Sequence, residues 1–206
     1  MPVVPSILAL TVHQTLTQKL SENSFNNGST PPAAKVFTTL DELMRCHKRS
    51  LHLDEDHVKH IHAYRDEFWN ESIMVCKHPR IDYKATPRIV FAGEADDAGG
   101  LGREYGTLLR NAIFSAEANL FEGQEERKLP LYSIDGIHSR LFLLAGKMVA
   151  YLIIHLDIGI PCLSPAVYNY IATGCVTPDC CSVDDIVDLE LKELISQVTG
   201  VHYAMK

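Results

Sequence analysis

The chain has 206 residues, which is enough for one or two domains and a sizeable buried core. Hydrophobic residues make up 46% of it and charged residues 22%, the composition of an ordinary globular protein. The formal net charge of −7 argues against broad nucleic-acid binding, because that activity needs a basic face to meet the phosphates.

The cysteines indicate a reducing compartment. Six of them are scattered along the chain without a close-spaced framework, and the first ten residues lack the basic start of a signal peptide. We therefore expect free thiols and a cytoplasmic or nuclear protein.

The first 38 residues are expected to be poorly ordered. Residues 21–34 are polar and contain a Gly and two Pro, as a linker does. Helix signals begin at Thr39, which forms a capping box with Glu42. We therefore divide the chain into an N-terminal segment with a linker, 1–38, and one folded unit, 39–206.

Residues 54–78 have helical spacing, and we predict one long helix there. Asp54 or Asp56 is placed to cap its N-terminus. Its mostly apolar face consists of Ile61, Tyr64, Phe68, Ser72 and Val75.

A strand and a second amphipathic helix follow. Residues 88–92, RIVFA, are the clearest strand in the sequence. Beyond a Gly-rich loop, apolar residues at helical spacing predict a helix. Its stripe consists of Leu101, Tyr105, Leu108, Leu109 and Ala112.

The longest apolar stretch, residues 141–163, is predicted to contain a central core helix and no membrane span. A Lys, a His and an Asp interrupt it, whereas a span needs about 20 mostly apolar residues. Gly159 and Pro161 are expected to end the helix.

Two further helices are predicted toward the C-terminus. Ser164 at the N-cap, Pro165 at the first helical position and Gly174 past the end define the first of them. The second is expected to start near Ser182 and to end at Gly200. The apolar face of this second helix consists of Leu191, Leu194, Ile195 and Val198.

Together the elements predict an α+β fold, mainly α-helical with a few short strands.

The Gly-rich loop before residue 101 is the first candidate for chemistry. A strand, then glycines, then a helix is the layout that binds phosphate at a helix N-terminus. However, Gly100, Gly102 and Gly106 lack the dinucleotide-binding spacing, and the acids of the loop would repel phosphate. Paired carboxylates for acid–base catalysis would need partners that the sequence does not reveal. We favour a tight turn in which the acids cap the helix. These acids are Glu94, Asp96 and Asp97.

His and Cys side chains crowd residues 46–78, and zinc binding is one interpretation. No close-spaced ligand pair is matched by a second pair at finger spacing, however. His57 and His60 share a face of the predicted helix, which suits a ligand pair but is weak evidence by itself. We favour solvated or capping histidines and predict no metal. The side chains concerned are Cys46, His47, His52, His57, His60, His62, Cys76 and His78.

Residues 174–181 hold three more cysteines, Cys175, Cys180 and Cys181. A cysteine nucleophile needs a base and an oxyanion donor, and the sequence offers neither. We interpret these residues as incidental or buried thiols. The sequence therefore assigns no catalytic, cofactor-binding or metal-binding residue.

Several segments, in order, resemble one family. The run IVFAGEADDAGGLGREYGTLL resembles the segment F-x-G-E…D-x-G-G-x-x-R-E-[FY] of HECT-type E3 ubiquitin ligases. LFEGQEERKLPL stands at the L-F-E-G stretch of that family, and FLLAGKMVAYLIIH resembles its F…G-[KR]-x-[IVM]-[AG] helix. LSPAVYNYIATG and DIVDLELKELISQV continue in the same order. The resemblance is strongest to the G2/M-phase-specific ligase-like group and runs from about Leu40 to Val198.

This resemblance implies a partial HECT N-lobe over residues 39–206. In the family the N-lobe receives a ubiquitin-charged E2 enzyme. A C-terminal lobe carries a cysteine that takes ubiquitin as a thioester and passes it to a substrate lysine, a role that suits a thiolate. The implied partners are an E2, ubiquitin and protein substrates. Arg103 and Glu104 are expected to make fixed polar contacts with partners that the sequence does not name.

The chain departs from the family in three ways. The run Gly93–Asp97 is one residue short, and Gly106 stands where a bulky aromatic residue is common. The chain also ends at Lys206, before the E2-binding region and the catalytic lobe of the family. We therefore expect no ubiquitin thioester on it, with apolar faces left uncovered. The alternative is a non-catalytic interaction module that competes with full-length ligases.

Overall fold

The structure, a computed structural model, describes residues 39–51, 53–93 and 100–204. The N-terminal segment predicted at 1–38 lies outside these ranges, as do residues 94–99 of the Gly-rich loop. In the described part helices predominate and strands are few, which confirms the mainly helical α+β class. None of its helices is long and apolar enough to cross a membrane.

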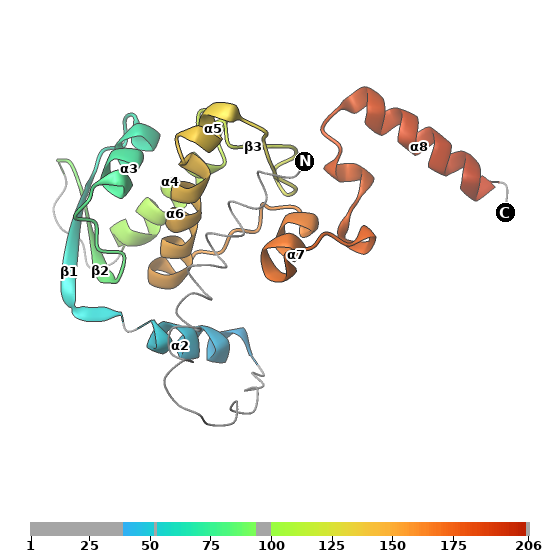
Figure 1. Cartoon of the computed structure of the whole chain (residues 1–206). Helices are drawn as coiled ribbons and strands as arrows, with labels where there is room; N and C mark the ends of the chain where they lie inside the picture. The colour runs from blue at the N-terminus through green and yellow to red at the C-terminus, as the bar shows by residue number, and fades with distance from the viewer. Residues whose placement is uncertain (1–38, 52, 94–99, 205–206) are drawn as a thin grey trace.

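A parallel pair of strands lies along one side of the molecule (Figure 1). Strand β1 (Asp54–Ala63) pairs with β2 (Ala85–Phe91), with Ile61 opposite Ile89. Parallel neighbours need a crossover connection, and α3 (Phe68–Lys77) provides it. These three elements form a βαβ unit.

The one long helix predicted across β1 and α3 is therefore wrong. Its second half is helical, but in β1 Ile61 and Ala63 are buried while His62 between them is exposed, the two-residue period of a strand. Pairing with β2 outweighs the helical spacing of the same apolar residues, because the strand exchanges backbone hydrogen bonds with a distant segment. Asp54 and Asp56, predicted as helix caps, belong to the strand.

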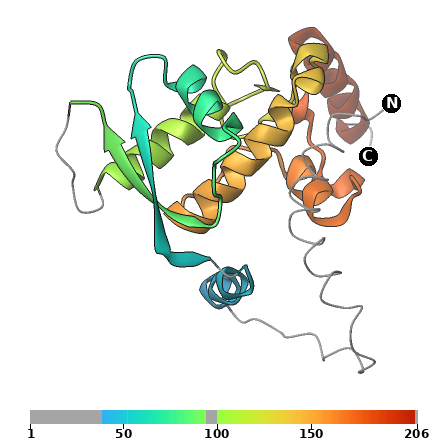
Figure 2. The ribbon, with the colours of Figure 1, turned by 60° about the vertical axis from the view of Figure 1, so that its left-hand side comes forward.

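Two long helices complete the core and confirm their predictions. Helix α4 (Gly100–Ile113) follows β2, and α6 (Leu141–Leu156) runs through the centre of the molecule (Figure 2). Helix α6 ends before the predicted stop at Gly159, because Asp157 takes a left-handed conformation with φ 52°.

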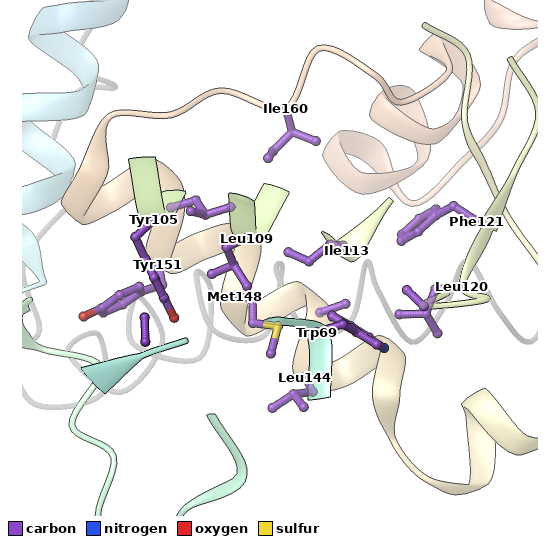
Figure 3. Packing of buried hydrophobic residues seen from close by; sticks show 14 of the residues in the cluster. Trp69, Tyr105, Leu109, Ile113, Leu120, Phe121, Leu144, Met148, Tyr151 and Ile160 are labelled. Carbon is purple, nitrogen blue, oxygen red and sulfur yellow. The ribbon is translucent and has the colours of Figure 1, made fainter. Parts of the chain in front are cut away.

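Side chains from the βαβ unit, α4 and α6 pack into one hydrophobic cluster (Figure 3). Trp69 of α3 and Met148 of α6 lie among them. Deleting one such side chain costs about 2–5 kcal/mol, so this cluster is the main source of stability. The largest fully buried apolar side chains are Phe91, Leu109, Ile113, Leu120, Phe142, Met148 and Leu152.

A short antiparallel pair and a short helix connect α4 to α6. Strand β3 (Phe121–Glu122) pairs with β4 (Leu129–Pro130), and α5 (Ile134–His138) follows. The Ser133 hydroxyl caps α5 by accepting a hydrogen bond from Gly136 N at 3.0 Å.

Helix α7 (Pro165–Thr173) begins and ends where the sequence predicts. The Ser164 hydroxyl accepts a hydrogen bond from Ala166 N at 3.2 Å, and Pro165 opens the helix. Gly174 closes it in the left-handed region, with φ 75°. These signals act within one turn, so the sequence is sufficient to place them.

The last helix starts later than predicted. The capping box of Ser182 and Asp185 is present, but it closes only a 3₁₀ turn, η2 (Val183–Asp185). Helix α8 (Leu189–Ala204) begins after Asp188, whose carboxylate accepts hydrogen bonds from the next turn. The predicted stop at Gly200 is wrong, since this glycine lies inside α8.

Helices α2 (Leu40–Ser50) and α8 lie at the periphery (Figure 1). The Thr39 hydroxyl caps α2, as predicted, by accepting a hydrogen bond from Glu42 N. Helix α2 buries no residue, and an ion pair between Lys48 Nζ and Asp157 Oδ1, at 2.7 Å, ties it to the end of α6.

Candidate functional site

The junction of β2 and α4 carries the densest motif of the sequence. The residues predicted to cap α4, at 94–99, lie outside the described part of the chain. Gly100 and Gly102 form the first turn of α4. Gly106 is buried further along, where an added Cβ atom would meet Ile158 Cδ1 at 2.2 Å. The Ile158 side chain, in the segment after α6, therefore occupies the space that a larger residue at position 106 would need.

Glu104 of α4 has a partner that the sequence could not name. Its Oε1 accepts hydrogen bonds from Arg65 Nε at 3.1 Å and Nη2 at 2.9 Å. The Arg65 guanidinium also lies over the Phe91 ring, 4.2 Å from its centroid. Arg103 is exposed and has no salt bridge within the described ranges. Of the Arg-Glu pair of the motif, Glu104 thus makes a structural contact, whereas Arg103 makes no ion pair with the residues that the structure describes.

Three tyrosines and a cysteine form a polar cluster inside the fold. The Tyr83 hydroxyl donates a hydrogen bond to the Cys76 carbonyl at 2.8 Å, and its ring meets Tyr151 edge to face. Burial raises the pKa of the Cys76 thiol to about 12, and it raises the pKa of Tyr83, Tyr105 and Tyr151 well above their usual value. All four groups stay protonated at neutral pH, so none is a nucleophile.

His155 joins this cluster from the last turn of α6. Its Nε2 lies 2.8 Å from the Tyr83 carbonyl oxygen, and its ring lies 4.6 Å from the Tyr151 ring. Loss of solvent lowers the pKa of His155, although the bond to Tyr83 opposes the change. A neutral imidazole that donates from Nε2 fits this geometry. The sequence placed His155 on an apolar face but gave no sign of its partner.

The described histidines and cysteines of residues 46–78 lie on or next to three elements, and His52 lies outside the described residues. Cys46 lies on α2, His60 on β1 and Cys76 on α3. His57 and His60 do not share a helix face, because they lie in a strand where positions three apart point to opposite sides. Within the described residues no three His, Cys, Asp or Glu side chains are grouped so that they could hold a metal ion.

The cysteines after α7 lie in a more exposed environment than Cys76. Cys180 is the end of the 3₁₀ turn η1 (Pro178–Cys180), and its sulfur contacts Thr177 and, at 3.5 Å, Asn169 Nδ2. Partial desolvation raises the pKa of Cys180, but these hydrogen bonds outweigh it and lower the pKa overall. The pKa of the adjacent Cys181 is raised. Neither Thr177 nor Asn169 can act as a general base, so among the described residues no acid–base partner contacts the Cys180 sulfur.

The face of α8 is the most exposed apolar surface of the described chain. Leu191 is 47% exposed, Leu194 60% and Val198 72%, although their spacing of three and four residues is that of a buried helix face. The helix extends away from the core (Figure 1). An ion pair between Lys192 Nζ and Asp184 Oδ1, at 3.0 Å, holds its first turns to η2. Such a face is typical of a surface that another protein segment covers.

The segment before α8 is held to the rest of the fold by the hydrogen bonds of Asp185. Arg127 donates a bidentate pair of hydrogen bonds to Asp185, at 3.0 Å from Nε and 2.9 Å from Nη2. Asp185 also accepts a hydrogen bond from Ser182 N. Although desolvation raises the pKa of Asp185, these contacts lower it overall. The turn that precedes α8 is therefore anchored to the β3–β4 connection.

Comparisons with protein-family models, with curated proteins and with solved structures found no significant match to this chain. Function must therefore be inferred from the residues themselves. What the geometry provides is a buried core, an exposed α8 face and cysteines without a catalytic base.

Proposed function

We propose that this chain is an N-lobe portion of a HECT-type E3 ubiquitin ligase. The observation that carries the proposal is the order of the motifs, from the run that ends in Arg103-Glu104-Tyr105 to the segment of α8. Their placement in the fold gives support, because the motifs supply α4, the β3 strand, the central helix α6 and α7. Residues with the strongest resemblance are thus those on which the core depends.

In this proposal the chain is a scaffold and not the transferring enzyme. Thioester formation needs an accessible thiolate. Burial raises the pKa of Cys76 to about 12 and also raises that of Cys162. Cys180 has a lowered pKa but no base beside it. Ubiquitin transfer would then use a cysteine of a further lobe, as the resemblance implies.

A chimaera tests the proposal. The E2-binding region and catalytic lobe of an active HECT ligase are fused after residue 198 and incubated with E1, E2, ubiquitin and ATP. We expect a reducible ubiquitin adduct on the grafted cysteine and none on the unfused chain. The matched controls are the graft with its cysteine replaced by alanine and the same graft on an unrelated helical domain.

Two results would overturn the proposal. One is a folded chimaera that supports no more transfer than the unrelated fusion. The other is a reducible ubiquitin adduct on the unfused chain, because that would place the transfer chemistry within these 206 residues. Circular dichroism and thermal unfolding establish that each protein is folded.

The exposed face of α8 favours a second candidate, a non-catalytic module that competes with complete ligases. Leu191 and Leu194 are 47% and 60% exposed, so they are free to contact a partner. Adding excess chain to a complete HECT ligase should then reduce substrate ubiquitination. Leu191→Glu with Leu194→Glu should relieve the inhibition, whereas Glu193→Gln, at an exposed position on the same helix, should not. If the double leucine variant still inhibits, the α8 face is not the surface that contacts the partner.

A further inference from the structure

A cleft of about 460 Å³ opens between α3 and α6, away from the junction of β2 and α4. One wall is the end of α3 and the segment that follows it, including Lys77, His78 and Pro79. The other wall is the start of α6, and the two helices pack against each other in the core. The volume is within the range of about 300–1,000 Å³ that small-molecule sites occupy.

Helix α6 presents one continuous stripe to this cleft. Leu143, Leu144 and Lys147 of α6 line it, and their spacing of three and four residues places them on a single helix face. Arg140, the N-cap residue that precedes the helix, lines the cleft beside them. Two cations therefore bracket a pair of leucines, so the wall has a charged position at each end and an apolar surface between them.

The charge of the cleft is opposite to that of the chain. Its lining contains Lys77, Arg140 and Lys147 and no acidic residue, whereas the whole chain carries −7. None of these three cations has a salt bridge among the described residues. Lys147 Nζ lies over the Tyr83 ring, 5.7 Å from its centroid, which orients the ammonium without neutralising it.

The groups nearest to these cations leave the positive charge uncompensated. Asp82 lies five residues from Lys77, and Asp135 lies five residues from Arg140; both acids are exposed and neither lines the cleft. The Asp82 carboxylate accepts a hydrogen bond from Lys84 N at 2.9 Å. His78 uses Nδ1 to accept a hydrogen bond from Arg80 N at 3.1 Å. Its Nε2 can then serve as a further donor on the same wall.

We propose that this cleft binds a phosphate monoester carried on an apolar group. A guanidinium and ammonium groups are the side chains that recognise phosphate oxygens, and they act most strongly where no carboxylate competes. The leucine surface between Arg140 and Lys147, with Pro79 and Tyr83 opposite, provides contact for the apolar part. The inference does not rest on the resemblance to ubiquitin ligases.

Isothermal titration calorimetry at low salt tests the proposal with three probes. Inorganic phosphate supplies the charge alone, phenol the apolar part alone, and phenyl phosphate both. We expect phenyl phosphate to bind at least about tenfold more tightly than either of the others. A peptide that contains phosphotyrosine is the fourth arm. If this peptide binds more tightly than phenyl phosphate, the natural ligand is a phosphorylated protein. If it binds less tightly, the natural ligand is a free metabolite.

Variants locate the site. Arg140→Gln and Lys147→Met should each weaken phenyl phosphate binding about tenfold or more. Arg103→Gln and Lys84→Met remove exposed cations outside the cleft, and each should change the affinity for phenyl phosphate by less than twofold. Circular dichroism and thermal unfolding confirm that all four variants fold. Equal losses in cleft and control variants, no saturable binding, or equal affinities for phenyl phosphate and inorganic phosphate would each overturn the proposal.

Discussion

Arg65 and Glu104 join the connection after β1 to the second turn of α4 through two hydrogen bonds to one carboxylate oxygen. The same guanidinium lies over the Phe91 ring at the end of β2. One side chain thus links three elements that converge at the Gly-rich loop. Both partners are 42% exposed, so the ion pair itself contributes little, about 0.2–1 kcal/mol.

We therefore predict that Arg65 matters more than Glu104 for stability. Glu104→Gln should lower the free energy of unfolding by less than about 1 kcal/mol, because only the exposed ion pair is lost. Arg65→Met should lower it by about 1–2 kcal/mol, because the contact with Phe91 is also lost. Urea denaturation measures both, and Arg103→Gln is the control for loss of a neighbouring exposed charge that has no ion pair among the described residues. A larger cost at Glu104 than at Arg65 would contradict this prediction.

Gly106 is predicted to be required by the approach of Ile158. An added Cβ atom would lie 2.2 Å from Ile158 Cδ1 and 3.0 Å from Leu156 Cδ1. Gly106→Ala should therefore destabilise the chain by about 1 kcal/mol, since overpacking outweighs the gain in helix propensity. Gly102→Ala is the control, because its Cβ would meet only Leu156 Cδ2 at an ordinary 3.7 Å.

A double-mutant cycle tests the cause. Ile158→Val removes the Cδ1 atom, so Gly106→Ala should cost less, or become stabilising, in that background. An unchanged cost would show that the backbone of α4 and not the side chain of Ile158 resists the substitution.

His155 is predicted to make the chain sensitive to mild acid. Its pKa is lowered in the folded state, so the unfolded chain takes up the proton first. The stability that the neutral imidazole contributes is complete above the ordinary histidine pKa of 6.5 and is lost as the pH falls toward the folded value. Melting temperatures at pH 7.5 and 5.5 should differ less in His155→Gln than in the natural chain. His60→Gln, at an exposed histidine, should keep the natural difference.

Cys76 and Cys180 are predicted to react with alkylating reagents at different rates. Burial raises the pKa of Cys76 to about 12, so it should resist alkylation in the folded chain, whereas Cys180 has a lowered pKa and should react early. Limited treatment with iodoacetamide followed by peptide mass spectrometry measures the order. Asn169→Ala should slow the reaction of Cys180, because it removes a hydrogen bond to the sulfur. Modification of Cys76 as fast as of Cys180 would contradict the predicted order.

Local signals were read correctly from the sequence where they act within one turn. The cap at Thr39 and the boundaries Ser164, Pro165 and Gly174 are found as predicted. A helix start near Ser182 was also predicted, but the capping box there closes a single 3₁₀ turn, because a cap alone does not provide the packing that extends a helix.

The strand β1 was not predicted, because the signal that defines it is a pairing with a distant segment. Ile61 fits both a helical stripe and an alternating strand, and only its partner Ile89 decides between them. The cations of the cleft were missed in the same way, because Lys77 and Arg140 come from distant segments. Neither relationship has a signature within a short window of sequence.

The sequence by itself determined the mainly helical class, the start of α2, both ends of α7 and the buried character of α6, because hydrophobic spacing and capping residues act over a few positions. The tertiary structure decided the parallel pairing of β1 with β2, the partner of Glu104 and the basic cleft between α3 and α6. Each of these depends on residues far apart in the chain that only the packed core brings within contact distance.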